Sequence, residues 1–420
     1  MNQLIIKYIS YLFIKNIQIF YYLFEMNNKL QFIIVVIGLS YLVNFLGVFQ
    51  HQQEFLAKYN DCKYLEADIQ LYGTEDSVVY NQDIIIGIHS SIHKVFTTNI
   101  EVNKLERGGF FAIYGISKGN LSAKKVKVLN HPQHLLFNPH GIEIREQFLY
   151  VINHSFYTGG ERVEKYEISL DEEGLVVLNY LHATKMDPQL NGTTNDVLFL
   201  SETRFIITQW LIFPIPLQGN GEQSIIYTLT TMISQFLNLK FTYAYDCKYV
   251  QNGEAICHKI ESSLGVAVNG IAFDGKDTIA ISDTIGRYLQ IYKLNDKKEL
   301  ELQQTLKTNF MIDNINYDLQ TQQFIASGSN TVYEYLLFNN KLERVLKNKS
   351  SKSSINYSAV VQAFKYNQFN KSFEPQLIFQ SSHSVATISG ALLDHSQNYL
   401  FLNNFSDKSI VVCNKNIQKK

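Results

Sequence analysis

No block of basic or acidic residues stands out in this chain, and charge of either sign is scarce. Only 18% of its 420 residues are charged, and 37 basic residues are balanced by 38 acidic ones. Proteins that bind nucleic acid need a basic patch to neutralise phosphates, so we expect no nucleic-acid partner. Disorder is also disfavoured, because 46% of the residues are apolar and disordered chains have low apolar content and high net charge.

Cysteine motifs typical of zinc sites are absent as well. The cysteines, Cys62, Cys247, Cys257 and Cys413, include no CxxC or CxxH spacing. An even number of cysteines in an exported chain suggests two disulfides, for which three pairings exist. Cys247 and Cys257 flank a turn-like QNGE (251–254), which favours a bridge across a hairpin and leaves Cys62 to pair with Cys413.

Long uncharged runs are confined to the N-terminal part of the chain. Residues 32–49 carry no charge and are long enough to cross a bilayer as a helix. Lys7, Lys15 and Lys29 precede this run, so the positive-inside rule places the N-terminus in the cytoplasm and the remaining chain in the lumen or outside the cell. We therefore expect residues 26–50 to be a signal anchor in the secretory pathway. A cleaved signal peptide, with a secreted chain, is the alternative.

Other features of an exported chain are less decisive. Residues 1–25 form either an interfacial helix or an extension ahead of a start at Met26. Sequons of the kind found in glycoproteins occur at Asn120, Asn191, Asn348 and Asn404.

Helical periodicity is rare after residue 55, where short runs rich in Val, Ile, Tyr and Phe alternate with turns of Gly, Asn, Asp and Ser. Such runs are typical of β-strands, and closely spaced pairs are typical of hairpins. Regularly spaced hairpins predict an all-β domain at residues 55–415, either a propeller, a sandwich or a barrel. Six units of about 57 residues would fill this length, which favours a six-bladed β-propeller. The runs include FFAIYGI (110–116), FLYVINH (148–154), VEKYEI (163–168), DTIAIS (277–282), RYLQIYKL (287–294), FIASGS (324–329), TVYEYLLF (331–338), YLFLNN (399–404) and SIVVCN (409–414).

One segment, residues 224–240, breaks this rhythm. Its apolar residues recur at spacings of three and four, which predicts an amphipathic helix. This helix either packs over the β-domain or faces a membrane beside the active site. The apolar positions are Ile225, Ile226, Leu229, Met232, Ile233, Phe236 and Leu237.

Acidic and amide residues lie in loops next to predicted strands. Each one alone fits a turn, since Asn and Asp favour turns. Together they supply the hard oxygen donors that Ca²⁺ requires, and in a propeller such loops converge at one end of the central channel. The residues are Glu75 and Asp76, Asn195 and Asp196, Asn269, and Asp313 and Asn314.

These motifs, in this order, resemble the paraoxonase/arylesterase family over roughly residues 50–415. The resemblance implies the propeller fold, a retained hydrophobic N-terminus and a disulfide between Cys62 and Cys413. The motifs that carry it are GTED (73–76), FNPHGI (137–142), VINH (151–154), the pair Asn195-Asp196, NGI (269–271) and IDN (312–314).

The resemblance also implies two calcium ions in the central channel. The catalytic ion would act as a Lewis acid on a substrate carbonyl, and the structural ion would hold the ligand loops in place. The catalytic ion would be bound by Glu75, Asn195, Asn269, Asp313 and Asn314. The structural ion would be bound by Asp76, Asp196 and the backbone carbonyl of Ile142.

His140 and His154 match the histidine dyad of the family. His140 would take a proton from the attacking water, and His154 would tune or relay it, because an imidazole is a usable base at neutral pH. The alternative is that His140 only packs beneath the site. Trp210 stands in a loop where the family carries a further histidine, which makes the expected channel wall more apolar.

The implied function is calcium-dependent hydrolysis of lactones and aryl esters. Serine-hydrolase chemistry is disfavoured because no GxSxG is present, and Ser389-Gly390 lies in a plain ISGALL run. A second class of function is a non-catalytic, membrane-tethered propeller that assists the folding or assembly of membrane proteins. The complete ligand set and both histidines favour the enzyme.

Overall fold

The computed structural model describes Gly38, Ser40 and residues 58–90, 107–155, 158, 160–214, 225–250, 253–330, 359–381, 388–405 and 410–416. The chain divides into two compact units, Met1–Gln50 and His51–Lys420. Apart from Gly38 and Ser40, the predicted anchor at 26–50 and the segment 1–25 lie outside the described residues, as does the predicted strand at 331–338. Among the described ranges, no helix has the length and apolar character needed to span a membrane.

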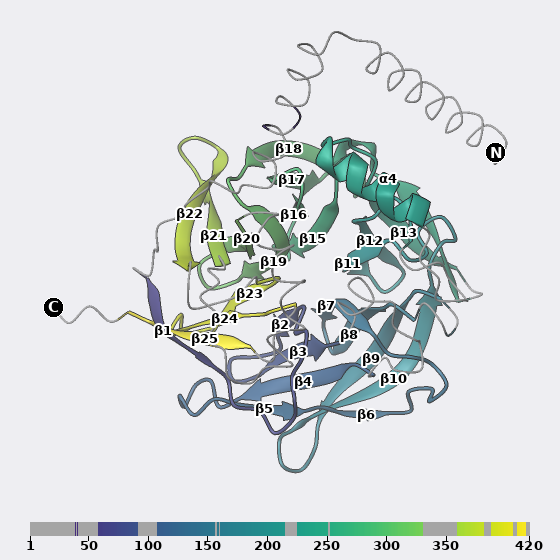
Figure 1. The fold of residues 1–420 in the computed structure, drawn as a ribbon. Helices are drawn as coiled ribbons and strands as arrows, with labels where there is room; N and C mark the ends of the chain where they lie inside the picture. The colour runs from purple at the N-terminus through teal and green to yellow at the C-terminus, as the bar shows by residue number, and fades with distance from the viewer. Residues whose placement is uncertain are drawn as a thin grey trace, which may run out of the picture. The chain divides into compact units, whose positions relative to one another are not determined.

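The described part of residues 51–420 is built almost entirely of β-strands, so the prediction of an all-β, propeller-like domain is confirmed. Four sheets have four strands each, and Figure 1 shows them arranged around a common centre. The first is β2 (Ser77–Val79), β3 (Ile85–His89), β4 (Gly109–Tyr114) and β5 (Ser122–Lys125). The second is β15 (Val268–Phe273), β16 (Thr278–Asp283), β17 (Tyr288–Leu294) and β18 (Leu300–Lys307). The third is β19 (Met311–Asp318), β20 (Gln323–Ser329), β21 (Ala359–Asn367) and β22 (Ser372–Ser381).

The fifth sheet has nine strands and corrects the expectation of six separate blades. It joins two antiparallel meanders, because the far end of one, at Lys185, pairs with Glu254 of the other. Its two end strands, β7 and β11, also pack against each other, so the sheet nearly closes on itself. Its strands are β6 (Lys127–Leu129), β7 (Pro139–Arg145), β8 (Phe148–Asn153), β9 (Arg162–Leu170), β10 (Val176–Lys185), β11 (Thr194–Ser201), β12 (Arg204–Gln209), β13 (Ala244–Val250) and β14 (Glu254–Lys259).

The remaining four-stranded sheet closes the ring with strands from both ends of the domain. Strand β1 (Tyr59–Tyr64) pairs antiparallel with β25 (Val411–Lys415), beside β24 (Tyr399–Leu402) and β23 (Ala391–Leu393). A disulfide joins Cys62 to Cys413 across this pair. A second disulfide joins Cys247 to Cys257 across the β13–β14 hairpin. Both predicted disulfides are therefore present.

The first strand of each meander forms the inner wall of the domain. Strands β2, β7, β11, β15, β19 and β23 pack against one another in a closed ring. Apolar side chains on the faces of neighbouring sheets fill the space between them, for example Phe110 and Leu149, or Phe324 and Leu289. The inner strands are held from outside by this packing, which fixes the positions of the polar residues that begin them.

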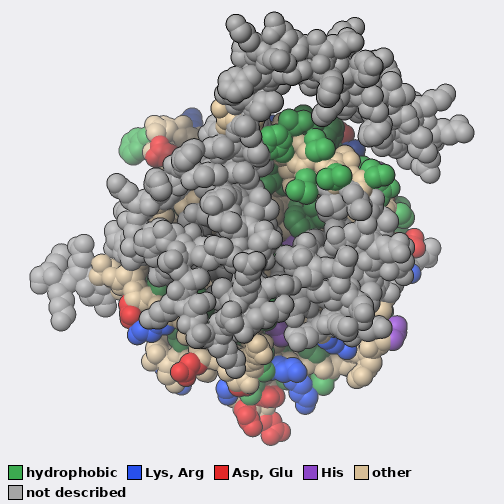
Figure 2. Space-filling view, in the orientation of Figure 1, with side chains coloured by type: hydrophobic (Ala, Val, Ile, Leu, Met, Phe, Trp, Pro, Cys, Tyr) green, Lys and Arg blue, Asp and Glu red, His purple; other side chains and the backbone are tan. Residues whose placement is uncertain are grey.

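Helix α4 (Ile225–Phe236) is the one α-helix that the structure describes in residues 58–416, and its faces are reversed relative to an ordinary surface helix. Thr231 and Ser234 are buried, whereas Ile226 is 68% exposed and Met232 is 55% exposed. Leu229 and Ile233 are exposed in the same way, and Figure 2 shows hydrophobic side chains gathered over this helix. Apolar surface of this kind marks a place where another apolar surface binds.

The sequons do not support a glycoprotein. Asn404 is 0% exposed, so an oligosaccharide could not be attached to it in the folded chain. The side-chain oxygen of Asn191 accepts a hydrogen bond from the Glu161 amide. Asn120 is exposed, and Asn348 lies outside the described residues.

Candidate active site in the central channel

The predicted site residues lie at the beginnings of the inner strands, where the pairing with the next strand is irregular. The register shifts between Pro139 and Ile142, between Thr194 and Val197, between Val268 and Ile271, and between Ile312 and Ile315. A β-bulge re-aims side chains and breaks strict alternation. The same irregularity, repeated in four strands, therefore explains how consecutive polar residues reach the channel.

Two glycines allow the inner strands to approach at these irregularities. A Cβ atom on Gly141 would lie 2.4 Å from Oδ1 of Asp196 and 2.7 Å from the carbonyl oxygen of Asn195. A Cβ atom on Gly270 would lie 2.6 Å from the carbonyl oxygen of Asp313. Only glycine permits such close backbone approach, so the Gly in NPHG and NGI is needed to assemble the site.

Asp76 and Asp196 tie neighbouring inner strands together in the same way. Asp76 accepts hydrogen bonds from the amides of Ser77 (2.8 Å) and Ile142 (3.3 Å). Asp196 accepts hydrogen bonds from the amides of Val197 (2.8 Å) and Ile271 (2.9 Å). Of the predicted second-ion ligands, the structure thus brings Asp76 and Ile142 into contact and places Asp196 one strand further around the ring.

The predicted first-ion ligands form a second connected group. Asn314 donates its side-chain amide to the carbonyl oxygen of Glu75 over 3.2 Å, and the side chains of Asn269 and Asp313 are hydrogen-bonded. Asn195 lies beside the loop of His140, because a Cβ atom on Gly141 would be 2.7 Å from its carbonyl oxygen. Residues that are up to 239 positions apart in the chain therefore meet in one small volume.

The two predicted histidines are in direct contact. Nδ1 of His140 lies 2.7 Å from Nε2 of His154, and Nε2 of His140 lies 3.4 Å from Oε1 of Glu75. On its other side, Nδ1 of His154 contacts the carboxylate of Glu161. All four side chains are buried. They form a continuous chain from Glu161 through both imidazoles to Glu75, the arrangement needed to hold or move a proton.

Burial shifts the ionisation of these groups strongly. It lowers the pKa of His140 to about 4, because an imidazolium is poorly solvated there. It raises the pKa of Glu75 to about 8 and that of Asp76 to about 7. Burial, with the neighbouring Asp76, also raises the pKa of Asp196 well above its usual range. The pKa of Asp313 is raised in the same way by burial and by Glu75.

The donor set fits a divalent cation. Oxygen atoms of Glu75, Asn195, Asn269 and Asn314 are buried and have no hydrogen-bond partner among the described residues, and buried polar atoms rarely stay unsatisfied. The nearby carboxylates would lose their charge unless a cation balanced it. Hard carboxylate and amide oxygens are the ligands that Ca²⁺ prefers. Within the described ranges, no group of three or more His, Cys, Asp or Glu side chains is arranged to hold a metal ion, and amides form most of this set.

Two residues near the site, Glu161 and Ser389, were not predicted to take part in it, whereas Trp210 was expected in the channel wall. Glu161 follows Gly160 in sequence and contacts His154 only because β8 and β9 pair. Ser389, dismissed as a nucleophile, donates its hydroxyl to the carbonyl oxygen of Glu75 over 2.7 Å and so supports that loop. The ring of Trp210 lies edge-on to His140, with centroids 6.0 Å apart. A carboxylate shortly after a motif histidine was the one signal that could have indicated Glu161.

Comparisons with known proteins show likeness at the level of the fold. No known family model matches the sequence, and no curated protein matches it. A solved structure assigned provisionally as a gluconolactonase is 14% identical, with a TM-score of 0.45 over 86% of this chain and 94% of that one. A luciferin-regenerating enzyme is 7% identical, with a TM-score of 0.44 over 82% and 92%. The periplasmic gluconolactonase of Pseudomonas aeruginosa is 11% identical, with a TM-score of 0.38 over 78% and 77%.

The family resemblance drawn from the sequence is therefore wrong. The similar structures are described as gluconolactonases and related enzymes, not as paraoxonases or arylesterases, and no family model supports that assignment. A physical reason lies in the motifs themselves. Closely packed inner strands with β-bulges require glycine beside polar residues such as Asn or Asp. A protein outside that family can therefore contain NPHG or NGI.

Proposed function

We propose that this chain is a hydrolase that cleaves lactones and aryl esters in its central channel with the help of bound calcium. The observation that carries the proposal is the chain of buried side chains from Glu161 through His154 and His140 to Glu75. It ends among carboxylate and amide oxygens for which the described part of the chain provides no hydrogen-bond donor. The solved structures described as gluconolactonases agree with a lactone substrate but are too distant to argue for it.

Burial lowers the pKa of His140 to about 4, so its imidazole is neutral at pH 7, and it is the group that would accept a proton from the attacking water. Its Nδ1 atom contacts His154 and its Nε2 atom faces Glu75, so one nitrogen is directed toward the oxygen-rich group. His154 would be the positioning residue that passes the proton on, and the Glu161 carboxylate would fix the orientation of its ring. Trp210 would exclude water on one side of His140 and provide an apolar wall for the substrate.

Two calcium ions are part of the proposal. Glu75, Asn195, Asn269, Asp313 and Asn314 would hold one, and Asp76, Asp196 and the carbonyl group of Ile142 would hold the other. The first ion would supply Lewis acidity toward an ester carbonyl. The protein contributes the fixed positions of these ligands through the hydrogen bonds and glycine contacts at the start of each inner strand.

A test of the proposal is turnover of an aliphatic δ-lactone and of phenyl acetate by the full chain, first with calcium and then with excess chelator. We expect hydrolysis that is lost on chelation and restored when calcium is added back. A folded chain that binds calcium but hydrolyses neither substrate would contradict the enzyme and favour a non-catalytic role in the assembly of membrane proteins.

We further propose that α4 rests on a lipid surface in the secretory pathway. The apolar residues Leu229 and Ile233 are exposed while the polar residues Thr231 and Ser234 are buried, and interfacial helices bind membranes through such an apolar face. Phe213, which follows β12, stacks on Tyr227 with ring centroids 4.5 Å apart. This contact ties the helix to the segment that carries Trp210. Apolar substrates dissolved in the lipid would then be close to the site.

A further inference from the structure

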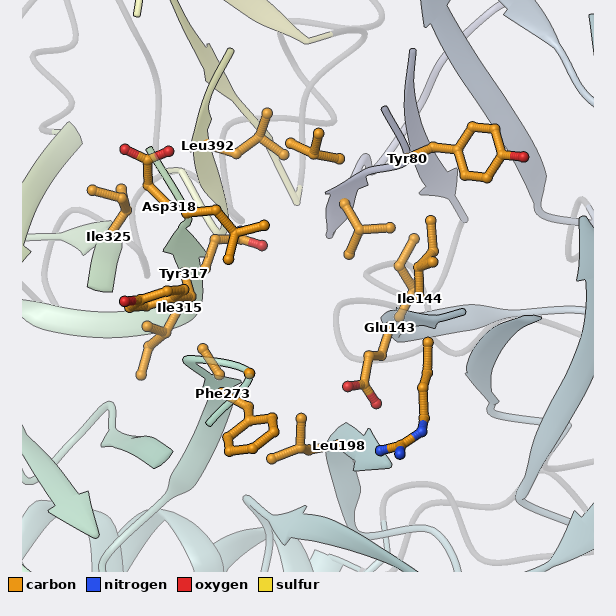
Figure 3. A pocket seen from close by; sticks show the side chains of 18 of the residues that line it. Tyr80, Glu143, Ile144, Leu198, Phe273, Ile315, Tyr317, Asp318, Ile325 and Leu392 are labelled. Atoms are coloured by element: carbon orange, nitrogen blue, oxygen red, sulfur yellow. The ribbon is translucent and has the colours of Figure 1, made fainter. Parts of the chain in front are cut away.

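A cavity of about 670 Å³ lies beyond the candidate site. Each inner strand contributes to it with residues that follow the site residues in sequence, such as Ile144 in β7, Leu198 in β11, Phe273 in β15 and Tyr317 in β19. The site therefore lies where the inner strands begin, and the cavity lies where they end. Figure 3 shows the side chains of this ring around the cavity.

The inner end of the cavity reaches the carboxylates of the candidate site. Asp76, Asp196 and Ile142 all line it, and Asp76 and Asp196 are 4% and 3% exposed. The cavity thus gives access to the group proposed to bind the second calcium ion. It is not the place where His140 and Glu75 lie, because neither lines it.

Acidic side chains predominate along this path. One carboxylate, Glu143, projects from the wall into the cavity (Figure 3). The Phe199 amide donates to its Oε2 atom, so the carboxylate is held in place. The guanidinium of Arg145 is engaged by the carbonyl oxygen of Phe199 over 2.8 Å. The acidic lining residues are Asp76, Glu143, Glu146, Asp196 and Asp318, and the only arginine or lysine among the described lining residues is Arg145.

The walls around these charges are largely apolar, including Val78, Phe273, Leu392 and Leu393. A cleft lined by charge of one sign with walls of low dielectric constant focuses the electric field and raises the local concentration of counter-ions. An apolar wall also offers no ligands at which a cation would be trapped. The cavity therefore attracts a cation at a few acidic side chains, and its apolar wall offers few ligands that would hold the cation tightly.

We propose that a divalent cation reaches the inner carboxylates through this cavity, and that Glu143 is the carboxylate at which it first binds. The inference rests on the proposed function for the ion itself, and adds the route and the residue that controls its exchange. Glu143 lines the cavity together with Asp76 and Asp196, so these two carboxylates come next on the path of an ion released by Glu143.

The first test compares calcium association in the wild-type full chain and in Glu143→Gln by stopped-flow mixing. Glu167→Gln is the matched control, because Glu167 is exposed on β9 and does not line the cavity. All three proteins are measured at the same pH, so that only the side chain at position 143 or 167 differs between them. We expect association to slow about tenfold in Glu143→Gln, the lower end of what electrostatic steering contributes, and to be unchanged in Glu167→Gln.

The second test closes the cavity after the protein has folded. Leu319 lines the cavity and is 72% exposed, and the four natural cysteines are all paired. A Leu319→Cys variant can therefore be labelled with biotin–maleimide at one thiol and capped with streptavidin. Phe369→Cys is the control, since Phe369 is 98% exposed and lies outside the cavity. We expect the cap to slow calcium release into a fluorescent chelator about tenfold or more only at position 319.

The two failures can be told apart. If the wild-type chain binds no calcium, both the proposed calcium-dependent function and the proposed route are contradicted. If calcium binds but Glu143→Gln and the capped Leu319→Cys variant exchange it at the wild-type rate, calcium binding is retained and the route through the cavity is contradicted.

Discussion

Buried oxygen atoms without hydrogen-bond donors are the most informative single atoms in the channel. Asn269 has one of them, and its side chain is also hydrogen-bonded to Asp313. We expect Asn269→Ala to weaken calcium binding and to reduce lactone turnover by about a hundredfold or more, as when one stabilising oxygen or donor is removed from a reacting centre. Calcium titration and kcat/KM measure the two effects separately.

The control for this prediction is Asn370→Ala, because Asn370 is an exposed turn residue whose side-chain amide donates to Glu374 and whose backbone amide donates to the side chain of Asn367. It should leave both quantities unchanged. Unaltered calcium affinity in Asn269→Ala would remove this residue from the proposed ligands.

The Glu161 carboxylate is a positioning residue for the histidine pair. It contacts His154 on one side and accepts the Gly192 amide over 2.7 Å on the other. We expect Glu161→Gln to lower kcat by about 10² to 10⁴ with little change in KM, because an amide in this place favours the wrong imidazole tautomer. A ¹⁵N spectrum of the histidine rings should report the altered tautomer directly.

The same sheet offers a matched control. Asp246 of β13 is paired with Arg204 of β12 over 2.7 Å. Asp246→Asn should affect stability but not kcat in the folded enzyme. If both variants lowered kcat equally, the effect of Glu161→Gln would be structural rather than catalytic.

At the scale of elements, the positions of strands could be predicted from the sequence, but the register shifts within them could not. FLYVINH and RYLQIYKL were predicted as strands and form β8 and β17, because β-branched and aromatic residues bounded by turn residues are a local signal. The register shift near His140 depends on which residues of β8 pair with β7. That is tertiary information, and so is the pairing of β8 with β9, which is the reason why the contact of His154 with Glu161 escaped prediction.

Helix α4 supports a prediction about membranes. Its apolar residues are exposed, with Leu229 at 51%. We expect Leu229→Asp to reduce co-sedimentation with phosphatidylcholine vesicles severalfold, because a charge replaces apolar area that would otherwise be buried in the interface.

Leu170→Asp is the matched control for this prediction, because Leu170 is a similarly exposed leucine, at 47%, at the end of β9. It should sediment like the wild type. Equal sedimentation of both variants would show that α4 does not contact lipid.

At the scale of the whole molecule, the all-β ring was predictable from evenly spaced hairpins, whereas the joining of two meanders into a nine-stranded sheet was not. The connection between the two meanders depends on the pairing of one residue with another, Lys185 with Glu254, and no local sequence pattern predicts this pairing. The family assignment failed for a related reason. Short motifs such as NPHG and NGI reflect local packing that requires glycine or asparagine. Several families contain such packing, so the motifs do not identify one family.

Closure of the ring is the feature of the whole molecule that can be tested most simply. The Cys62–Cys413 disulfide joins residues 351 positions apart, and the Cys247–Cys257 disulfide joins residues 10 positions apart. Chain entropy predicts roughly 5–6 kcal/mol of stabilisation from the first and about 3 kcal/mol from the second, as upper limits. We expect the double replacement of Cys62 and Cys413 by Ser to lower the free energy of unfolding by more than the same replacement in the hairpin.

Urea unfolding of the two double variants measures this difference. Each variant loses one disulfide between paired strands, so the chemistry of the change is the same and only the length of the closed loop differs. Calcium should be held constant, because a ligand that binds only the folded state adds to its stability. An equal loss in both variants would mean that the pairing of β1 with β25 holds the ring closed without the disulfide, and that packing between the inner strands is the larger contribution to closure.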